Sequence, residues 1–251
     1  MAVLKTEGII LKKYELRETS YILVVYTRDF GKVTGVIKGV RNPSPQFAGD
    51  LERFTKCEIL FYKKKKKGLD LISGCRAIET YLPIRKEIER LTYADYFIEL
   101  IDIVTDDYCP DKKLYDIFSG SLGMLATKAS AKRTGRIFEI KILEAIGLEP
   151  QLEECSECGV SMESVSRFNV KSGGAVCSSC VKTGIKVSMG TINFMKKIGR
   201  TSIEKSAAVK VSKEVGKEAE IVLREFIKYH INRPIKSTKF LRQLELEKII
   251  T

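Results

Sequence analysis

The first eighty residues carry short runs of apolar residues that are separated by turn signals. The runs are rich in Val, Ile, Phe and Tyr, as β-strands usually are, and they lie at 4–11, 21–27, 33–40, 51–62 and 69–78. Between the second and third runs, Arg28 to Lys32 form a short hairpin connection in which Gly31 supplies the left-handed position. Five short strands predict a small barrel of the OB type, although an SH3-like barrel would give much the same pattern.

From Pro83 the apolar positions change to helical spacing. The expected helices run from 83 to a break at 106–110, over 111–127, over 133–146, from about 188, over 212–231 and from 237. Gly147 and Pro150 form a helix-stop pair. Ser188, Ser212 and Ser237 suit N-cap positions, because a serine side chain accepts a hydrogen bond from the first helical turn.

Four cysteines stand between these helical segments in a metal-binding pattern. Cys155 and Cys158 form one C-x2-C pair, and Cys177 and Cys180 form a second pair after eighteen intervening residues. Two such knuckles complete a tetrahedron of thiolates with no open position, which favours one structural zinc ion. An iron centre is the minor alternative, and a redox dithiol lacks the βαβ pattern that would support it.

Three further cysteines are scattered along the chain. Charged residues precede any adequate apolar stretch at the N-terminus, which argues against a secretory signal, and no apolar run is long enough to span a membrane. We therefore expect a cytoplasmic protein in a reducing compartment, without a disulfide framework. Cys57, Cys75 and Cys109 are expected to be small core residues.

The charge of the chain is strongly positive and uneven. Forty-four Lys and Arg stand against 32 Asp and Glu, which gives a net charge of +12. Residues 1–80 carry 16 basic and 9 acidic side chains, residues 81–150 carry 10 and 12, and residues 151–251 carry 18 and 11. Two basic blocks that flank an acidic middle favour a partner with phosphate groups, whereas the plain alternative is a lysine-rich surface.

The basic residues of the expected barrel are candidates for contacts with nucleic acid. They are Lys12, Lys13, Arg17, Lys32, Lys38, Arg41 and an unbroken run of Lys63, Lys64, Lys65, Lys66 and Lys67. If they line one face, a single strand can follow the groove while Tyr14, Tyr21 or Phe47 offers a ring for base stacking. Taken alone, the lysine run is as well explained by a solvated hairpin tip.

Catalytic motifs are missing from the sequence. There is no phosphate-binding GxxxxGK[ST] loop and no GxGxxG segment. The single histidine, His230, lies at the end of an expected helix, where capping or packing is the simpler role. We therefore expect a binding protein and not an enzyme.

Several short motifs follow one another along nearly the whole chain. They are Gly31-Lys32-Val33, 37–41 (IKGVR), 51–54 (LERF), 138–150 (FEIKILEAIGLEP), Cys155 to Gly159, Phe168 to Cys180 and 235–241 (IKSTKFL). In this order they resemble the RecO family of bacterial recombinational-repair proteins, with Ile37 at a position where alanine is usual.

The resemblance implies an α+β multidomain protein. Its parts would be an N-terminal OB-fold at 1–80, a helical domain at 81–151 and 183–251, and an inserted zinc module at 152–182. It also implies binding of single- and double-stranded DNA, annealing of complementary strands and partnership with RecR. With RecR, such proteins help to load RecA onto DNA coated by single-strand-binding protein (SSB).

Family members also recognise the acidic, apolar C-terminal tail of SSB. Arg136 opens an apolar helix and aligns with a basic residue of the family's tail pocket, and a basic rim on an apolar groove suits a peptide that ends in a carboxylate. A solvated residue of the first helical turn explains Arg136 equally well. Some members lack the cysteines, which implies that zinc supports the fold and not the shared activity. Two other classes stay open, a zinc-ribbon RNA-binding or transcription-associated protein and a metal-dependent nuclease.

Overall fold

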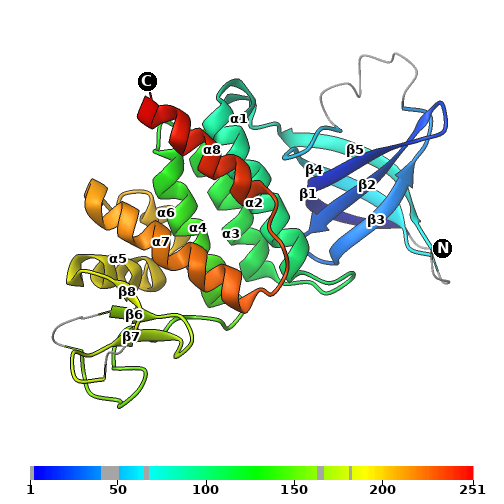
Figure 1. The fold of residues 1–251 in the computed structure, drawn as a ribbon. Helices are drawn as coiled ribbons and strands as arrows, with labels where there is room; N and C mark the ends of the chain where they lie inside the picture. Colours follow the sequence, from blue (N-terminus) through cyan, green and yellow to red (C-terminus); the bar gives the residue numbers. More distant parts are fainter. Residues whose placement is uncertain (1–2, 41–50, 65–67, 163–166, 181–182, 251) are drawn as a thin grey trace. The chain divides into compact units, whose positions relative to one another are not determined.

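The computed structural model describes residues 3–40, 51–64, 68–162, 167–180 and 183–250 (Figure 1). The chain divides into two compact units, residues 1–126 and residues 127–251. Within the described residues, no helix is both long enough and apolar enough to cross a membrane.

The first unit is built on a closed five-stranded barrel. Its strands are β1 (Val3–Leu16), β2 (Ser20–Thr27), β3 (Gly31–Ile37), β4 (Lys56–Tyr62) and β5 (Asp70–Glu79), in the order β1-β2-β3-β5-β4. The long β1 pairs with β2 through its C-terminal half and with β4 through its N-terminal half, and β3 runs parallel to β5. The OB-type barrel expected from the alternating apolar runs is therefore confirmed.

The barrel interior is filled by the inward residues of all five strands. These include Leu23, Val33, Ile59, Phe61 and Ile72, each at most 2% exposed. Two of the scattered cysteines, Cys57 and Cys75, are buried in the same core as expected.

Three helices accompany the barrel in this unit, α1 (Leu82–Lys86), α2 (Ile88–Val104) and α3 (Lys112–Leu125). The single helix expected from residue 83 is interrupted, because Glu87 is extended and ends α1 before α2 begins. The side chain of Arg85 donates to the carbonyl oxygen of Arg53 at 2.7 Å, a tertiary contact of α1 that helical periodicity does not predict.

The connection between α2 and α3 packs on the start of β3. The backbone N–H of Tyr108 donates to the carbonyl of Lys32 at 3.1 Å, and a side chain on Gly31 would meet the backbone of Cys109 at 2.5 Å. Gly31 is therefore required both for its positive φ of 67° and for this close approach. The expectation that Cys109 is a core residue is wrong, because it lies exposed on this surface connection.

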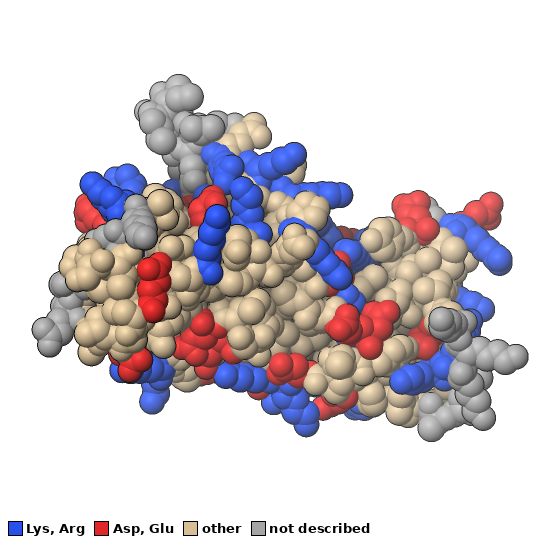
Figure 2. Space-filling model, turned by 60° about the horizontal axis from the view of Figure 1, so that its bottom comes forward, with Lys and Arg blue, Asp and Glu red and all other residues tan. Residues whose placement is uncertain are grey.

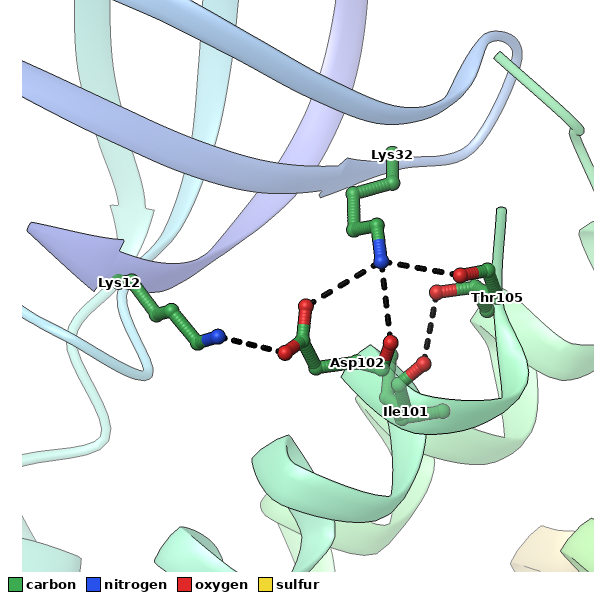
Figure 3. Close-up of polar contacts among 5 residues, drawn as sticks. All are labelled: Lys12, Lys32, Ile101, Asp102 and Thr105. Atoms are coloured by element: carbon green, nitrogen blue, oxygen red, sulfur yellow. Dashed lines mark hydrogen bonds and ion pairs between the residues drawn. The ribbon is translucent and has the colours of Figure 1, made fainter. Parts of the chain in front are cut away.

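Asp102, near the end of α2, joins that helix to two strands of the barrel (Figure 3). Its carboxylate accepts from Lys12 of β1 at 2.5 Å and from Lys32 of β3 at 3.2 Å. The Lys32 ammonium also donates to the carbonyl oxygens of Asp102 and Thr105, at 3.0 and 2.9 Å. These are C-terminal carbonyls of a helix, where a positive charge is favoured.

The second unit is a helical layer with a small sheet. Its helices are α4 (Ala131–Ala145), α5 (Met189–Arg200), α6 (Ile203–Ser206), α7 (Lys213–His230) and α8 (Ser237–Ile250), and its strands are β6 (Arg167–Asn169), β7 (Gly174–Val176) and β8 (Ile185–Lys186). The sheet has the order β7-β6-β8, and α4, α5 and α7 pack against one another. The expected caps Ser188 and Ser212 accept from Thr191 and Val215, whereas Ser237 is the first residue of α8 and not its cap.

The α+β class, with a barrel, helices and an inserted four-cysteine module, is confirmed. The compact units place α1–α3 with the barrel, and the small sheet with the remaining helices. The division into a DNA-binding barrel at 1–80, a helical domain at 81–151 and 183–251 and a zinc module at 152–182 stays a prediction.

The contact of Asp102 with its two lysines gives a first prediction. Burial raises the pKa of this carboxyl, but the hydrogen bond from Lys12 and the charge of Lys32 outweigh burial, so the pKa lies below its ordinary value. Asp102→Asn should cost about 1–2 kcal/mol of unfolding free energy at neutral pH, measured by urea unfolding with hydrogen exchange of the barrel amides.

The effect should depend on pH with a definite sign. A lowered folded-state pKa contributes stability above the unfolded pKa of about 4, and that stability is lost as the pH falls through the folded value. The difference between wild type and Asp102→Asn should therefore shrink below about pH 4. Asp116, whose side chain is 54% exposed and pairs with Arg28 at 3.5 Å, is the matched control, and Asp116→Asn should change stability by less than about 0.5 kcal/mol. Equal effects of the two variants at neutral pH would contradict the role of Asp102.

Candidate nucleic-acid interface and metal centre

One rung of the barrel presents a continuous line of apolar and aromatic side chains on the outer surface. Register pairs its members one after another around the barrel, in the order Tyr14, Ile22, Val36, Leu71, Tyr62 and Val3. We call these six residues the outer row. The adjacent rung, which contains Ile37, Phe61 and Ile72, points into the core, so alternation directs the outer row outward. Tyr14 is 50% exposed and Val3 49%.

Basic side chains border the outer row on both sides. Lys38 directly follows the end of β3, two residues after Val36, and Arg17 lies in the turn three residues after Tyr14. Lys63 and Lys64 directly follow Tyr62, the last residue of β4. Because β4 runs antiparallel to β5 and β5 runs parallel to β3, these two lysines lie on the opposite side of the outer row from Lys38. All four side chains are exposed. Arg17 shares its turn with the exposed Glu18, so the more strongly positive edge is that of Lys63 and Lys64.

The start of the lysine run is fixed by two neighbours. Asp70, 2% exposed, accepts from the backbone N–H of Lys64 at 2.9 Å and from the hydroxyl of Tyr108. The Lys63 ammonium lies 3.8 Å from the centroid of the Tyr108 ring, a cation–π distance. Burial and the Asp70 carboxylate raise the pKa of Tyr108 above its ordinary value, so its hydroxyl stays a donor.

Other basic residues of the predicted set are engaged within the first unit. Lys12 and Lys32 pair with Asp102, and the Lys32 side chain is only 14% exposed. Lys13 pairs with Glu52, and its ammonium lies 5.0 Å from the centroid of the Tyr21 ring. For these three lysines a contact with nucleic acid would require breaking an ion pair, so their role as DNA ligands stays a prediction.

The remaining candidates of the barrel are placed differently. Arg41, Phe47, Lys65, Lys66 and Lys67 lie outside the described residues. Tyr21 packs against the barrel core, so it does not lie on the outer row. Tyr62 belongs to that row although the sequence pattern does not single it out, because its position follows from strand register and not from its neighbours in the chain.

Charges of both signs are interspersed over the face drawn in Figure 2. Acidic side chains lie between the lysines and arginines there, so this face is not one uninterrupted positive field. A site for phosphate groups must therefore be built from local clusters of exposed basic residues.

The four cysteines of the two knuckles come together in the second unit. The sulfur atoms of Cys155, Cys158, Cys177 and Cys180 all lie within 4.8 Å of one another. Cys158 and Cys177 have their sulfurs 3.9 Å apart. Thiolates at a Zn–S distance of about 2.3 Å in a tetrahedron are about 3.8 Å apart, so the cluster fits a single tetrahedral metal ion.

The backbone around the first knuckle prepares it for a metal. Gly159 has φ of +73°, and its N–H donates to the Cys155 carbonyl at 2.9 Å, which closes the turn. The N–H of Cys177 donates to the Cys155 sulfur at 3.4 Å. Burial raises the pKa of the Cys155 thiol, but backbone N–H groups, that of Cys177 foremost, outweigh it and bring the pKa down to about 6. A thiolate is the form that binds a metal.

The module around the cysteines is attached to the helices by polar and aromatic contacts. Glu153 pairs with Lys196 at 2.8 Å and with Arg200 at 2.5 Å, both on α5. Phe168 of β6 packs edge-to-face on Phe226 of α7, with ring centroids 5.6 Å apart. A metal in this cluster would cross-link a module that already contacts α5 through Glu153 and α7 through Phe168.

Arg136 is buried in an ion cluster between α4 and α7. It is 3% exposed and contacts Glu139 at 2.7 Å and Glu220 at 3.4 Å, and Glu220 also contacts Arg224 at 2.5 Å. A cavity of about 320 Å³ begins one turn along the same helices, with Ile140 and Leu223 in its wall. Lys196 and Arg200 line the same cavity.

Two family models match almost the whole chain. "Recombination protein O N terminal" matches residues 1–81, and "Recombination protein O C terminal" matches residues 85–239. A protein named DNA repair protein RecO from Desulforamulus reducens is 31% identical over 97% of this chain and 96% of its own length. The proteins of the same name from Syntrophus aciditrophicus and Pelotomaculum thermopropionicum are 30% and 29% identical, over 96% of this chain each and over 96% and 94% of their own lengths. The chain belongs to the RecO family of DNA repair proteins.

Proposed function

We propose that this protein binds single- and double-stranded DNA and anneals complementary strands in recombinational repair. The observation that carries the proposal is the outer row with exposed basic residues on both of its sides, Arg17 and Lys38 on one and Lys63 and Lys64 on the other. With RecR, the protein would help to load RecA onto DNA coated by SSB in the bacterial cytoplasm. The names of its relatives support a role in repair.

The proposed mechanism is electrostatic and needs no turnover of a substrate. Two DNA strands repel each other through their phosphates, and lysine and arginine side chains that bind both strands lower the repulsion that opposes pairing. The ring of the single histidine, His230, packs on the rings of Phe226 and Tyr229, at centroid distances of 4.2 and 5.0 Å, and so has the packing role expected from the sequence.

The proposal is tested by annealing of complementary oligonucleotides coated with SSB, without nucleotide or added metal. Lys63→Glu with Lys64→Glu should slow annealing and weaken binding of a single strand. If each lysine neutralises one phosphate, the slope of log K against log[salt] should become shallower by about 0.7 for each of the two lysines, or about 1.4 for the pair.

A charge-matched variant controls for net charge. Lys86 is exposed on α1 and Lys112 is 69% exposed on α3, so Lys86→Glu with Lys112→Glu changes the net charge equally without touching the outer row. This control should keep the wild-type salt slope. Absence of annealing by the wild-type protein at low salt would refute the proposal, whereas magnesium-dependent cleavage would indicate a nuclease and preference for structured RNA an RNA-binding protein.

We also propose that the metal is one structural zinc ion held by Cys155, Cys158, Cys177 and Cys180. Four thiolates at tetrahedral spacing support zinc over metals that prefer oxygen ligands, and a closed site leaves no position for a reacting water. When bound, zinc would supply only cross-linking of the two knuckles.

Metal analysis of a cysteine variant checks this proposal. Wild-type protein should carry one zinc per chain, and Cys158→Ser should lose most of it. Amide exchange should then rise in residues 152–180, because the knuckles lose their cross-link, and stay unchanged in the barrel. Cys109, exposed in the first unit, is the control, and Cys109→Ser should keep the zinc. Full zinc content in Cys158→Ser, or iron in the wild-type protein, would contradict the assignment.

We further propose that the second unit binds the acidic, apolar C-terminal tail of SSB, as expected for Arg136. The cavity beside Ile140 and Leu223 has apolar walls and two basic side chains, Lys196 and Arg200, which support this. Glu144, Glu149 and Glu153 also line it, and Glu153 pairs with both basic side chains, so the tail carboxylate would have to replace Glu153 in these ion pairs. The buried Arg136 would then not contact the peptide directly. Its ion pairs with Glu139 and Glu220 would instead hold α4 and α7 together beside the cavity.

Two arginine variants separate these roles. Arg136→Ala leaves the fully buried Glu139 without this partner and should destabilise the second unit by roughly 3–5 kcal/mol. Arg200 is 73% exposed, so Arg200→Ala should lower the unfolding free energy by less than about 1 kcal/mol. The same variant should weaken binding of a tail peptide, measured by fluorescence anisotropy. Unchanged peptide affinity in Arg200→Ala and in Lys196→Ala would exclude this cavity as the tail site.

A further inference from the structure

We infer that the outer row is a base-stacking platform that selects unpaired DNA, with Tyr14 and Tyr62 as its two rings. The inference rests on the proposed function, since the bordering basic residues must hold the phosphates. It goes further in assigning the preference for single strands to two named side chains.

The geometry of the row carries the inference. Tyr14 and Tyr62 point outward on the same rung and are separated by Ile22, Val36 and Leu71. Four strand spacings of about 4.8 Å place the two tyrosines about 19 Å apart along the curved surface, a span within the few nucleotides that an OB-type barrel accommodates. All six members of the row are apolar or aromatic, so bases meet no charged group on it.

The exposure of the row indicates that it has a ligand. Tyr14 and Val3 are about half exposed, at 50% and 49%, and Leu71 is 37% exposed, whereas Ile22, Val36 and Tyr62 are half-buried. Apolar side chains gathered on a sheet surface favour an occupant that removes them from water.

The charges that border the row favour nucleic acid as this occupant. Lys63 and Lys64 stand on one side of the row and Lys38 on the other. A single strand fits both the basic border and the apolar row, because its phosphates can face the lysines while its bases cover the rings. In a duplex the faces of the bases are already stacked, so the platform has nothing to bind.

The absence of tryptophan from the chain makes a direct experiment possible. In Tyr14→Trp and in Tyr62→Trp, the new side chain is the only tryptophan of the protein. Titration with an oligothymidylate at low salt should quench its fluorescence, because the indole stacks on a base. Tyr229→Trp is the matched control, since Tyr229 is 52% exposed on α7 of the second unit, and its fluorescence should not change.

Affinity measurements give an independent result. Tyr14→Leu and Tyr62→Leu should each weaken binding of a single strand by about 5-fold to 100-fold, the range expected for loss of one stacked base, and should leave the salt slope and the duplex affinity unchanged. Lys63→Glu with Lys64→Glu should instead change the salt slope for both forms of DNA.

The outcomes separate the inference from the proposed function. Unquenched tryptophans and unchanged affinity of the leucine variants, with a clear effect of the lysine variants, would overturn the stacking platform and leave the electrostatic interface. Equal quenching by a duplex of the same length would overturn the selection of unpaired bases. If neither the lysine nor the tyrosine variants change DNA binding, both proposals fail, and the row is then a docking surface for a protein.

Discussion

Much of the first unit depends on the carboxylate of Asp102 and the two lysines that share it. Lys12 and Lys32 come from different strands, and one acidic side chain at the end of α2 binds both, at 2.5 and 3.2 Å. Lys32 also donates to two carbonyl oxygens at the C-terminal end of this helix, where a positive charge is favoured. Lys12 and Lys32 are therefore both engaged on α2, and the outer row crosses β1 and β3 further along these strands, at Tyr14 and Val36.

This arrangement explains why the positions of basic residues in the sequence do not by themselves show which of them are available for the proposed nucleic-acid interface. Lys32 lies near the start of β3 and Lys38 directly follows its end, and the two look equivalent in the sequence. Lys32 is 14% exposed and donates to two carbonyl oxygens and a carboxylate, whereas Lys38 is exposed past the end of β3. What distinguishes them is Asp102, seventy residues after Lys32, and only the folded chain brings it near. Local composition predicts a basic module, and tertiary contacts decide which of its charges are available.

The features that could be predicted from the sequence are those that local spacing encodes. The two C-x2-C pairs predicted a four-cysteine cluster because each knuckle is a short turn, and the strands were predicted from runs rich in Val, Ile, Phe and Tyr that turn signals separate. The outer row could not be predicted as a row. Val3, Tyr62 and Leu71 become neighbours only through strand register, and a shift of one residue would have turned Tyr62 into the core. The break between α1 and α2 could not be predicted either, because Glu87 is extended there and the spacing of apolar residues does not indicate it.

Electrostatic contacts and stacking respond differently to conditions, and the barrel surface has groups for both. The proposed phosphate contacts of Lys38, Lys63 and Lys64 would weaken steeply as salt rises, because the release of counterions then gains less entropy. Contacts of apolar rings with bases are far less sensitive to salt. The stacking share of the binding free energy should therefore grow with ionic strength, and with it the preference for unpaired strands over duplex. The proposed annealing needs this difference, because single strands must be held while they find a complement and the duplex must then be released. Once bases pair with each other, Tyr14 and Tyr62 would lose their partners, and only the proposed phosphate contacts would remain to hold the product.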